Sequence, residues 1–364
     1  MKAAILYEAG KPLVVEDGVT VDAPKKGELK IRVAATAVCH SDLHFIKGDI
    51  PAKLPGLAGH ETAGYVEEVG EGVTDFKPGD TVVLGTVTAG CGHCYYCTIG
   101  LRHFCVNRQI VSPGQMHHTN SKGQRLGTLA GPVGGFAEYT TVSQLVATKI
   151  PKDMPLDRAA LLACGVSTGF GAVVNRAKVQ ALDSVVVIGT GGVGLNSIQA
   201  AQFSGANPVI AVDILDSKLE TAKKFGATHT INGKTEKDPI KKVFELTSGR
   251  GADFVFVTVG NIDAIRQGFS MSGPRGMTVV IGLAMGNLAA IMPIELVMSE
   301  KILTGCGGGS LRTSIDIPNL VSLYQSGRLK LDELISGHYP LEKINDAITS
   351  LEKGEALRNI IVME

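Results

Sequence analysis

The stretch Ser184–Gly194, which reads SVVVIGTGGVG, decides the fold of this chain. Three consecutive valines and an isoleucine form an unbroken apolar run, which predicts a strand over Ser184–Ile188 that is buried on both faces. A glycine-rich turn follows, and the sequence after it predicts a helix from about Gly192 to Ser204. A buried strand, a tight turn and a helix in this order form the first half of a βαβ unit.

The alternation of strands and helices continues along the chain and stops near residue 307. It predicts an α/β domain with a doubly wound parallel sheet, because parallel strands need crossover helices between them. Before residue 165, short β-rich runs are broken by Gly/Pro turns, which predicts a second, β-rich domain. The expected upstream strands are 29–34, 63–69 and 81–84. The expected downstream elements are strands 208–212, 254–259 and 277–281 and helices 217–225, 237–247, 262–270, 318–326 and 341–353.

The glycine turn has the spacing G-x-G-x-x-G, which lets a backbone approach a pyrophosphate at the N-terminus of a helix. Asp213 ends the next expected strand, 19 residues after Gly194, where an acid can accept hydrogen bonds from the adenine ribose. The pattern therefore predicts a dinucleotide site that prefers NAD to NADP. Asp213 could instead be a helix N-terminal acid, and Lys218 either a ribose contact or a solvated helix residue. The glycines of the turn are Gly189, Gly191, Gly192 and Gly194.

The composition argues against several classes of protein. Lysine plus arginine and aspartate plus glutamate both number 35, so no basic surplus points to nucleic acid. No apolar run reaches the length of about 18 residues that a membrane span needs. The N-terminal sequence MKAAILYEAG has no apolar signal core. We therefore expect a cytoplasmic protein with neither a nucleic-acid nor a membrane partner.

Four of the seven cysteines share the spacing C-x2-C-x2-C-x7-C, which is dense enough to hold one metal ion. Four thiolates make a closed tetrahedral site, so the pattern predicts a structural zinc lobe. An iron–sulfur cluster is the main alternative, and a disulfide cluster would need an oxidising compartment. The four residues are Cys91, Cys94, Cys97 and Cys105.

Three residues that are far apart in the chain suggest a second metal site. Cys39 lies in CHSDLH, His60 in GHE and Cys164 in ACG. Two thiolates and one imidazole would leave the fourth position of a zinc ion open, as catalytic sites do. The residues could equally be two inert buried cysteines and a core histidine, since spacing alone does not bring them together.

Motifs in this order and spacing resemble the zinc-dependent medium-chain alcohol dehydrogenases along essentially the whole chain. The matching motifs are Cys39–Asp42, Gly59–Gly64, the four-cysteine lobe, Cys164–Gly169, the Gly189–Gly194 turn and Asp213. The resemblance implies a GroES-like catalytic domain made of residues 1–165 and 308–364, with an inserted Rossmann NAD domain over 166–307. It also implies two zinc ions per chain: a catalytic one at Cys39, His60 and Cys164, and a structural one in the lobe.

The same resemblance implies roles for the residues around the catalytic zinc. Ser41 and His44 would relay the alcohol proton towards solvent. Asp42 would orient His60, and Glu61 would lie behind the zinc. Substrate and nicotinamide would meet between the two domains. The cofactor contacts that it implies are His40 and Arg358 at the pyrophosphate and Thr168 and Val193 at the nicotinamide.

By the same resemblance, Phe45, Leu54 and Val87 stand at pocket positions, and all three are apolar. The expected substrate is therefore an uncharged alkyl, allylic or aromatic alcohol, or the corresponding aldehyde or ketone. Cys164 argues against polyol dehydrogenases, which tend to carry Glu there. A thiol-adduct formaldehyde dehydrogenase stays an alternative. Those enzymes carry an arginine shortly after the lobe; this chain has Gln109 at that position, with Arg108 next to it. A non-catalytic zinc or nucleotide-binding protein on the same fold is a further alternative.

Two more expectations concern surfaces. The pair His117 and His118 lies in a polar stretch, which predicts that both are exposed. An edge strand near Met298–Gly305 and the apolar segment Ala289–Met298 predict a homodimer, with a homotetramer as the alternative.

Overall fold

A computed structural model describes residues 1–107, 117–288, 291 and 293–363. It divides the chain into two compact units: residues 1–165 with 312–364, and residues 166–311. The described residues contain no helix that is both long and apolar enough to cross a membrane. Arg108 and Gln109, on which the thiol-adduct alternative depends, lie outside the described residues.

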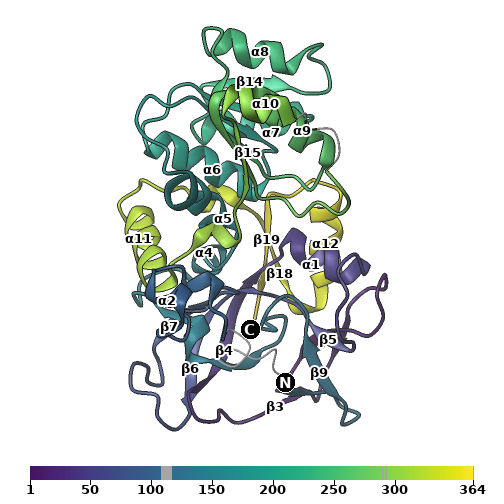
Figure 1. The fold of residues 1–364 in the computed structure, drawn as a ribbon. Helices are drawn as coiled ribbons and strands as arrows, with labels where there is room; N and C mark the ends of the chain where they lie inside the picture. The colour runs from purple at the N-terminus through teal and green to yellow at the C-terminus, as the bar shows by residue number, and fades with distance from the viewer. Residues whose placement is uncertain (108–116, 289–290, 292, 364) are drawn as a thin grey trace. The chain divides into compact units, whose positions relative to one another are not determined.

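The unit of residues 166–311 is built on one six-stranded sheet (Figure 1), whose paired strands are all parallel. The strand order is β14-β13-β12-β15-β16-β17, in which the chain starts in the middle and winds outwards twice. This confirms the expected doubly wound, Rossmann-type sheet. The strands are β12 (Val185–Ile188), β13 (Val209–Asp213), β14 (His229–Asn232), β15 (Ala252–Val257), β16 (Ser272–Val280) and β17 (Ile302–Gly305).

The central strand β12 is buried along its whole length, as its apolar sequence predicts. Val186 and Ile188 belong to the core cluster that also contains Ile210, Val255 and Val257 from the neighbouring strands. The principal helices between the strands are α6 (Gly192–Phe203), α7 (Asp216–Lys224), α8 (Pro239–Leu246) and α9 (Ile262–Met271).

The other unit is dominated by β-structure. One sheet has the order β11-β7-β6-β4-β19-β18, with β10 also paired to β4. A second sheet has the order β2-β1-β5-β9-β8-β3. The C-terminal strand β19 (Arg358–Val362) pairs with β4 (Glu28–Ala37), so the two ends of the sequence share one sheet (Figure 1). This pairing returns residues after 312 to the N-terminal unit.

Most of the remaining strands of this unit are short, although β6 has nine residues. They are β1 (Ala3–Leu6), β2 (Val14–Glu16), β3 (Thr20–Val21), β5 (Gly56–Leu57), β6 (Glu61–Val69), β7 (Thr81–Leu84), β8 (His118–Thr119), β9 (Arg125–Thr128), β10 (Tyr139–Ser143), β11 (Ala147–Lys149) and β18 (Ile335–Pro340). Its main helices are α1 (His40–Lys47), α2 (Tyr95–Thr98), α4 (Leu156–Leu161), α11 (Thr313–Gln325) and α12 (Ile344–Glu352).

Several elements differ from the sequence-based expectation, and two of them have a clear physical reason. Strand β14 is missing from it, because HTIN is short and half polar and its strand character comes from pairing with β13. Helix α11 begins at Thr313 rather than at Pro318, so the proline lies inside the helix and not at its start. The expectation placed Pro318 at the first helical turn, where proline is best tolerated.

Candidate active site and metal centres

Loops beside the central strands bring three separated ligand candidates together. Cys39 lies between β4 and α1, His60 directly before β6, and Cys164 shortly after α4. One ligand atom from each of these residues and from Glu61 lies within 4.8 Å of the others. All four residues belong to the unit of residues 1–165 and 312–364. Two sulfurs and an imidazole nitrogen at such distances fit a zinc ion, and Glu61 adds a carboxylate.

Asp42 orients His60 and ties it to Cys39. Its Oδ1 lies 3.0 Å from His60 Nδ1, and its Oδ2 accepts the Cys39 backbone N–H at 3.0 Å. Oδ1 also accepts the Gly59 backbone N–H at 3.2 Å. The fully buried carboxylate holds the proton of the neutral imidazole on Nδ1, and in that form Nε2 has a lone pair for a metal.

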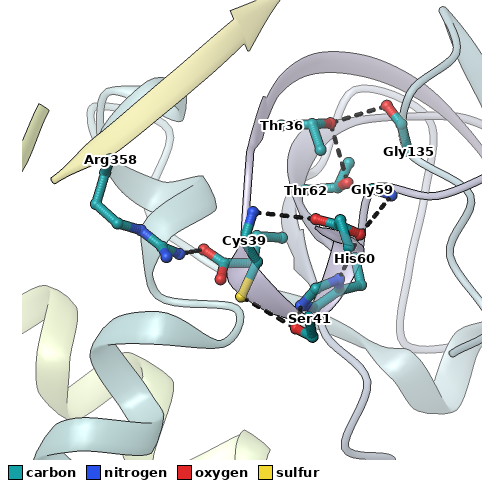
Figure 2. A network of polar contacts seen from close by, with 10 residues as sticks. Thr36, Cys39, Ser41, Gly59, His60, Thr62, Gly135 and Arg358 are labelled. Carbon is teal, nitrogen blue, oxygen red and sulfur yellow. Dashed lines mark hydrogen bonds and ion pairs between the residues drawn. The ribbon is translucent and has the colours of Figure 1, made fainter. Parts of the chain in front are cut away.

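Ser41 stands beside two of the ligand atoms (Figure 2). Its hydroxyl donates to Cys39 Sγ at 3.1 Å and lies 3.2 Å from His60 Nε2. His44 follows three residues later in α1, so both side chains lie on the same side of that helix. His44 Nδ1 lies 2.9 Å from Asp49 Oδ2, and the side chain is half-buried.

Glu61 is buried and forms an ion pair with Arg358. Figure 2 shows Arg358 on the C-terminal strand β19. Only Glu61 Oε2 takes part in this pair. Its second oxygen, Oε1, is buried and has no hydrogen-bond partner among the described residues. A buried carboxylate oxygen without a donor suits a nearby cation, which is a second observation in favour of a metal here.

The ionisation of this cluster is strongly perturbed. The hydrogen bond from Cys164 holds the pKa of Cys39 well below its usual range, and the same bond, with burial, raises the pKa of Cys164. Burial raises the pKa of Glu61 to about 8 despite Arg358. Burial lowers the pKa of His60, but Asp42 and Cys39 outweigh it and raise the pKa overall. The two sulfurs thus share one proton, which a divalent cation would displace.

The four-cysteine lobe forms a second cluster, whose sulfurs all lie within 4.8 Å of one another. No disulfide joins any of the seven cysteines, all of which the structure describes. Asn107 Nδ2 donates to Cys91 Sγ at 3.5 Å, a contact that the sequence did not predict. Burial raises the pKa of Cys97 to about 11, so a metal that binds there must release a proton. Four converging thiol groups fit a structural zinc.

The glycine turn and Asp213 lie in contact in the other unit. Asp213 Oδ2 accepts the Thr190 backbone N–H at 2.8 Å and the Thr190 hydroxyl at 2.9 Å. A Cβ on Gly194 would lie 1.8 Å from Gly189 O, so the turn packs too closely for a side chain there. A Cβ on Gly191 would meet no atom within 4 Å, and α6 begins at the next residue. This open backbone at a helix N-terminus fits a pyrophosphate group.

The other predicted cofactor contacts differ in their exposure to solvent. His40 is exposed at the start of α1, Thr168 is buried, and Val193 and Lys218 are half-buried. Arg358 is buried with Glu61, and its predicted contact with a pyrophosphate stays a prediction.

The expectation that His117 and His118 are exposed is wrong. Both are buried: His117 lies between Asp22 and Glu28, and His118 Nε2 donates to Tyr139 O at 2.9 Å. Their partners are distant in the sequence, so the polar neighbours of the pair gave a misleading signal.

A pair of buried threonines, Thr36 and Thr62, was also missed (Figure 2). They lie three residues before Cys39 and two residues after His60. The sequence signal for this pair is a threonine on a strand, close to a candidate metal ligand. This signal is weak, because threonine is common in strands.

The converging thiolate–imidazole set and the nucleotide-binding turn define a metal-dependent dehydrogenase of two units. Family models agree: residues 25–152 match the alcohol dehydrogenase GroES-like domain, and residues 192–326 match the zinc-binding dehydrogenase domain. The chain therefore belongs to the zinc-dependent medium-chain alcohol dehydrogenase family.

Individual relatives cover the chain almost completely. An NDMA-dependent alcohol dehydrogenase of Amycolatopsis methanolica is 39% identical over 99% of this chain and 98% of its own. The S-(hydroxymethyl)glutathione dehydrogenase of Saccharomyces cerevisiae is 38% identical, over 99% of this chain and 95% of its own. The crystal structure of benzyl alcohol dehydrogenase from Acinetobacter calcoaceticus has a TM-score of 0.92 and 33% identity, and covers 100% of this chain and 99% of that one.

Proposed function

We propose that this protein oxidises an apolar primary or secondary alcohol with NAD, and reduces the corresponding aldehyde or ketone, at a zinc site formed by Cys39, His60 and Cys164. The observation that carries the proposal is the position of Ser41, whose hydroxyl contacts both Cys39 Sγ and His60 Nε2. A proton-carrying hydroxyl beside the ligand atoms is what the removal of an alcohol proton needs.

Zinc supplies a Lewis acid for the alcohol oxygen when it is bound, and NAD supplies the hydride acceptor. The residues of the chain do the rest. Ser41 receives the alcohol proton and passes it outwards, and His44 delivers it to solvent. Asp49, 2.9 Å from His44 Nδ1, favours the tautomer in which Nε2 is the base.

The apolar substrate class is supported by the candidate pocket residues and by one relative. Phe45 and Leu54 are half-buried and pack against the apolar core of their unit. The structurally similar Acinetobacter protein is a benzyl alcohol dehydrogenase. An aromatic or allylic alcohol also makes the aldehyde product conjugated, which favours oxidation.

A second candidate function is the oxidation of a thiol adduct of formaldehyde, because the yeast relative at 38% identity is an S-(hydroxymethyl)glutathione dehydrogenase. Steady-state kcat/KM values for benzyl alcohol, allylic and secondary alcohols and S-(hydroxymethyl)glutathione, each with NAD and with NADP, separate the two. We expect the largest value for an apolar alcohol with NAD. A larger kcat/KM for S-(hydroxymethyl)glutathione than for any apolar alcohol would refute the proposed substrate class and favour the thiol adduct.

Metal analysis tests the zinc assignment independently of turnover. We expect two zinc ions per chain, one for each four-residue cluster. Cys164→Ala should abolish turnover and leave one zinc, in the lobe. A single zinc in the unmodified protein, or iron with a cluster absorption band, would contradict the assignment.

A further inference from the structure

A threonine pair joins the two strands that carry the zinc-ligand candidates. Thr36 of β4 and Thr62 of β6 are cross-strand partners, both are fully buried, and their Oγ1 atoms lie 3.0 Å apart. Cys39 follows Thr36 by three residues, and His60 precedes Thr62 by two. A buried hydroxyl is costly to keep unless it is hydrogen-bonded, so this pair needs its partners.

The direction of the hydrogen bonds in this pair is defined. Thr36 Oγ1 donates its only proton to the carbonyl oxygen of Gly135 at 2.9 Å. Thr62 must then be the donor between the two hydroxyls, because a hydroxyl carries one proton. The Gly135 N–H in turn donates to Gly59 O at 2.7 Å. Gly135 is thereby held on one side by the threonines and on the other by the loop that carries His60.

Packing at this junction leaves no freedom for a side chain. A Cβ on Gly135 would lie 1.9 Å from Thr62 Oγ1 and 2.9 Å from Gly59 O. Gly59 has φ +89°, and a Cβ there would lie 2.6 Å from Phe136 N. The two glycines therefore permit a close approach of two loops, and the threonine hydroxyls fix it.

The last link runs from Gly59 to the ligand candidates. Gly59 N–H donates to Asp42 Oδ1, the oxygen that also holds His60 Nδ1, while Asp42 Oδ2 holds the Cys39 backbone. Figure 2 shows the contacts of Thr62, Thr36 and Gly135 and, beside them, those of Gly59 and His60; the backbone bond from Gly135 N–H to Gly59 O joins the two sets. A shift of Gly59 would therefore alter its hydrogen bond to the Asp42 carboxylate.

We propose that Thr36 and Thr62 are positioning residues for this metal site, which fix the direction of His60 Nε2 and Cys39 Sγ by clamping Gly135 onto Gly59. The inference rests on the proposed function, since it takes Cys39 and His60 as zinc ligands. Partners behind the ligands are worth about 10–100-fold in metal affinity in known sites. Thr36 acts through two glycine residues, so its effect belongs at the lower end of that range.

The test uses the purified zinc-loaded enzyme and measures the rate at which each zinc is lost to a chelator. Thr36→Val keeps the shape of the side chain and removes the hydroxyl. We expect the catalytic zinc to leave about tenfold faster in this variant. The lobe zinc should leave at an unchanged rate. Thr36→Ser should restore the unmodified rate, and Thr62→Val should have a smaller effect, because the bond from Thr36 to Gly135 survives.

Thr141→Val is the matched control. Thr141 is buried in β10, which pairs with β4, and its hydroxyl donates to Asp22 O at 2.8 Å, away from the ligand loops. We expect it to lower the melting temperature about as much as Thr36→Val, without faster loss of the catalytic zinc. Equal zinc retention in Thr36→Val and Thr141→Val would reduce Thr36 to a stability role and overturn the proposal. An unmodified enzyme without the catalytic zinc would overturn the proposed function as well.

Discussion

At the scale of single residues, the proposed relay makes Ser41 and His44 unequal. Ser41→Ala removes a hydroxyl that contacts both Cys39 Sγ and His60 Nε2, so kcat should fall by about 10²–10⁴-fold with the zinc content unchanged. His44→Gln should cost less, because His44 is half-exposed and water or added base can replace it. Measurement of kcat with and without an exogenous base checks both. Near-normal turnover in Ser41→Ala would mean that the proton leaves by another route.

Asp213 has a second residue-scale consequence, because it holds the glycine turn as well as the expected ribose position. Asp213→Gly should narrow the preference for NAD over NADP, since a carboxylate repels the 2′-phosphate. It should also lower kcat/KM with both cofactors, because the Thr190 N–H and hydroxyl lose their acceptor. Loss of the turn contacts affects both cofactors alike, so the ratio of kcat/KM for NAD to kcat/KM for NADP reports only the role of Asp213 at the ribose. Equal efficiency with both cofactors in the unmodified enzyme would show that Asp213 does not face the ribose.

At the scale of elements, the strongly patterned segments were predictable and those that depend on distant partners were not. The glycine turn and β12 follow from local sequence, because an apolar run followed by a G-x-G-x-x-G spacing is typical of the first strand and turn of a dinucleotide-binding βαβ unit. The ion pair of Glu61 with Arg358 joins residues 297 positions apart, and no local pattern reports it. The same holds for the buried His118, whose hydrogen-bond partner Tyr139 lies 21 positions away.

The ligand set itself could be named only through resemblance to a family. Spacing identified the lobe, where four cysteines lie close in sequence. Cys39, His60 and Cys164 are brought together by the β4–β6 pairing and by α4, which the sequence does not reveal locally.

The burial of His118 in β8 predicts that the folded protein loses stability in acid. Burial lowers the pKa of His118 to about 4. The unfolded chain binds a proton near the ordinary pKa of about 6.5, so the unfolding free energy should fall as pH falls between these values. The full loss is at most about 3 kcal/mol, from 1.36 kcal/mol per pKa unit.

His118→Gln removes this titration and keeps a side-chain donor for Tyr139 O. Thermal unfolding of both proteins between pH 7 and pH 4, in excess zinc, should show a shallower decline for the variant. The neighbouring His117 and Asp22 titrate in both proteins and Arg125 stays charged throughout, so the difference belongs to His118. Parallel curves would mean that folding does not lower the pKa of His118.

At the scale of the whole molecule, the open edge of the nucleotide-binding sheet bears on assembly. Strand β17 is last in the strand order and pairs only with β16 among the described strands. Beside it in sequence, α10 (Pro293–Ser299) carries Val297 and Met298, whose exposed fractions are 71% and 76%. An unpaired strand edge next to exposed apolar side chains favours association, because a partner would pair the edge and cover the apolar side chains.

A second copy related by a two-fold axis meets this need, because the same edge then pairs with itself and the same apolar side chains face each other. We therefore expect light scattering to give a dimer mass at dilute concentration. Val297→Glu together with Met298→Lys should shift the mass towards the monomer, because charged groups at the centre of such a contact lose water without full compensation. A monomer mass for the unmodified protein would refute the edge-pairing argument. A tetramer that survives the double substitution would place the principal contact elsewhere on the chain.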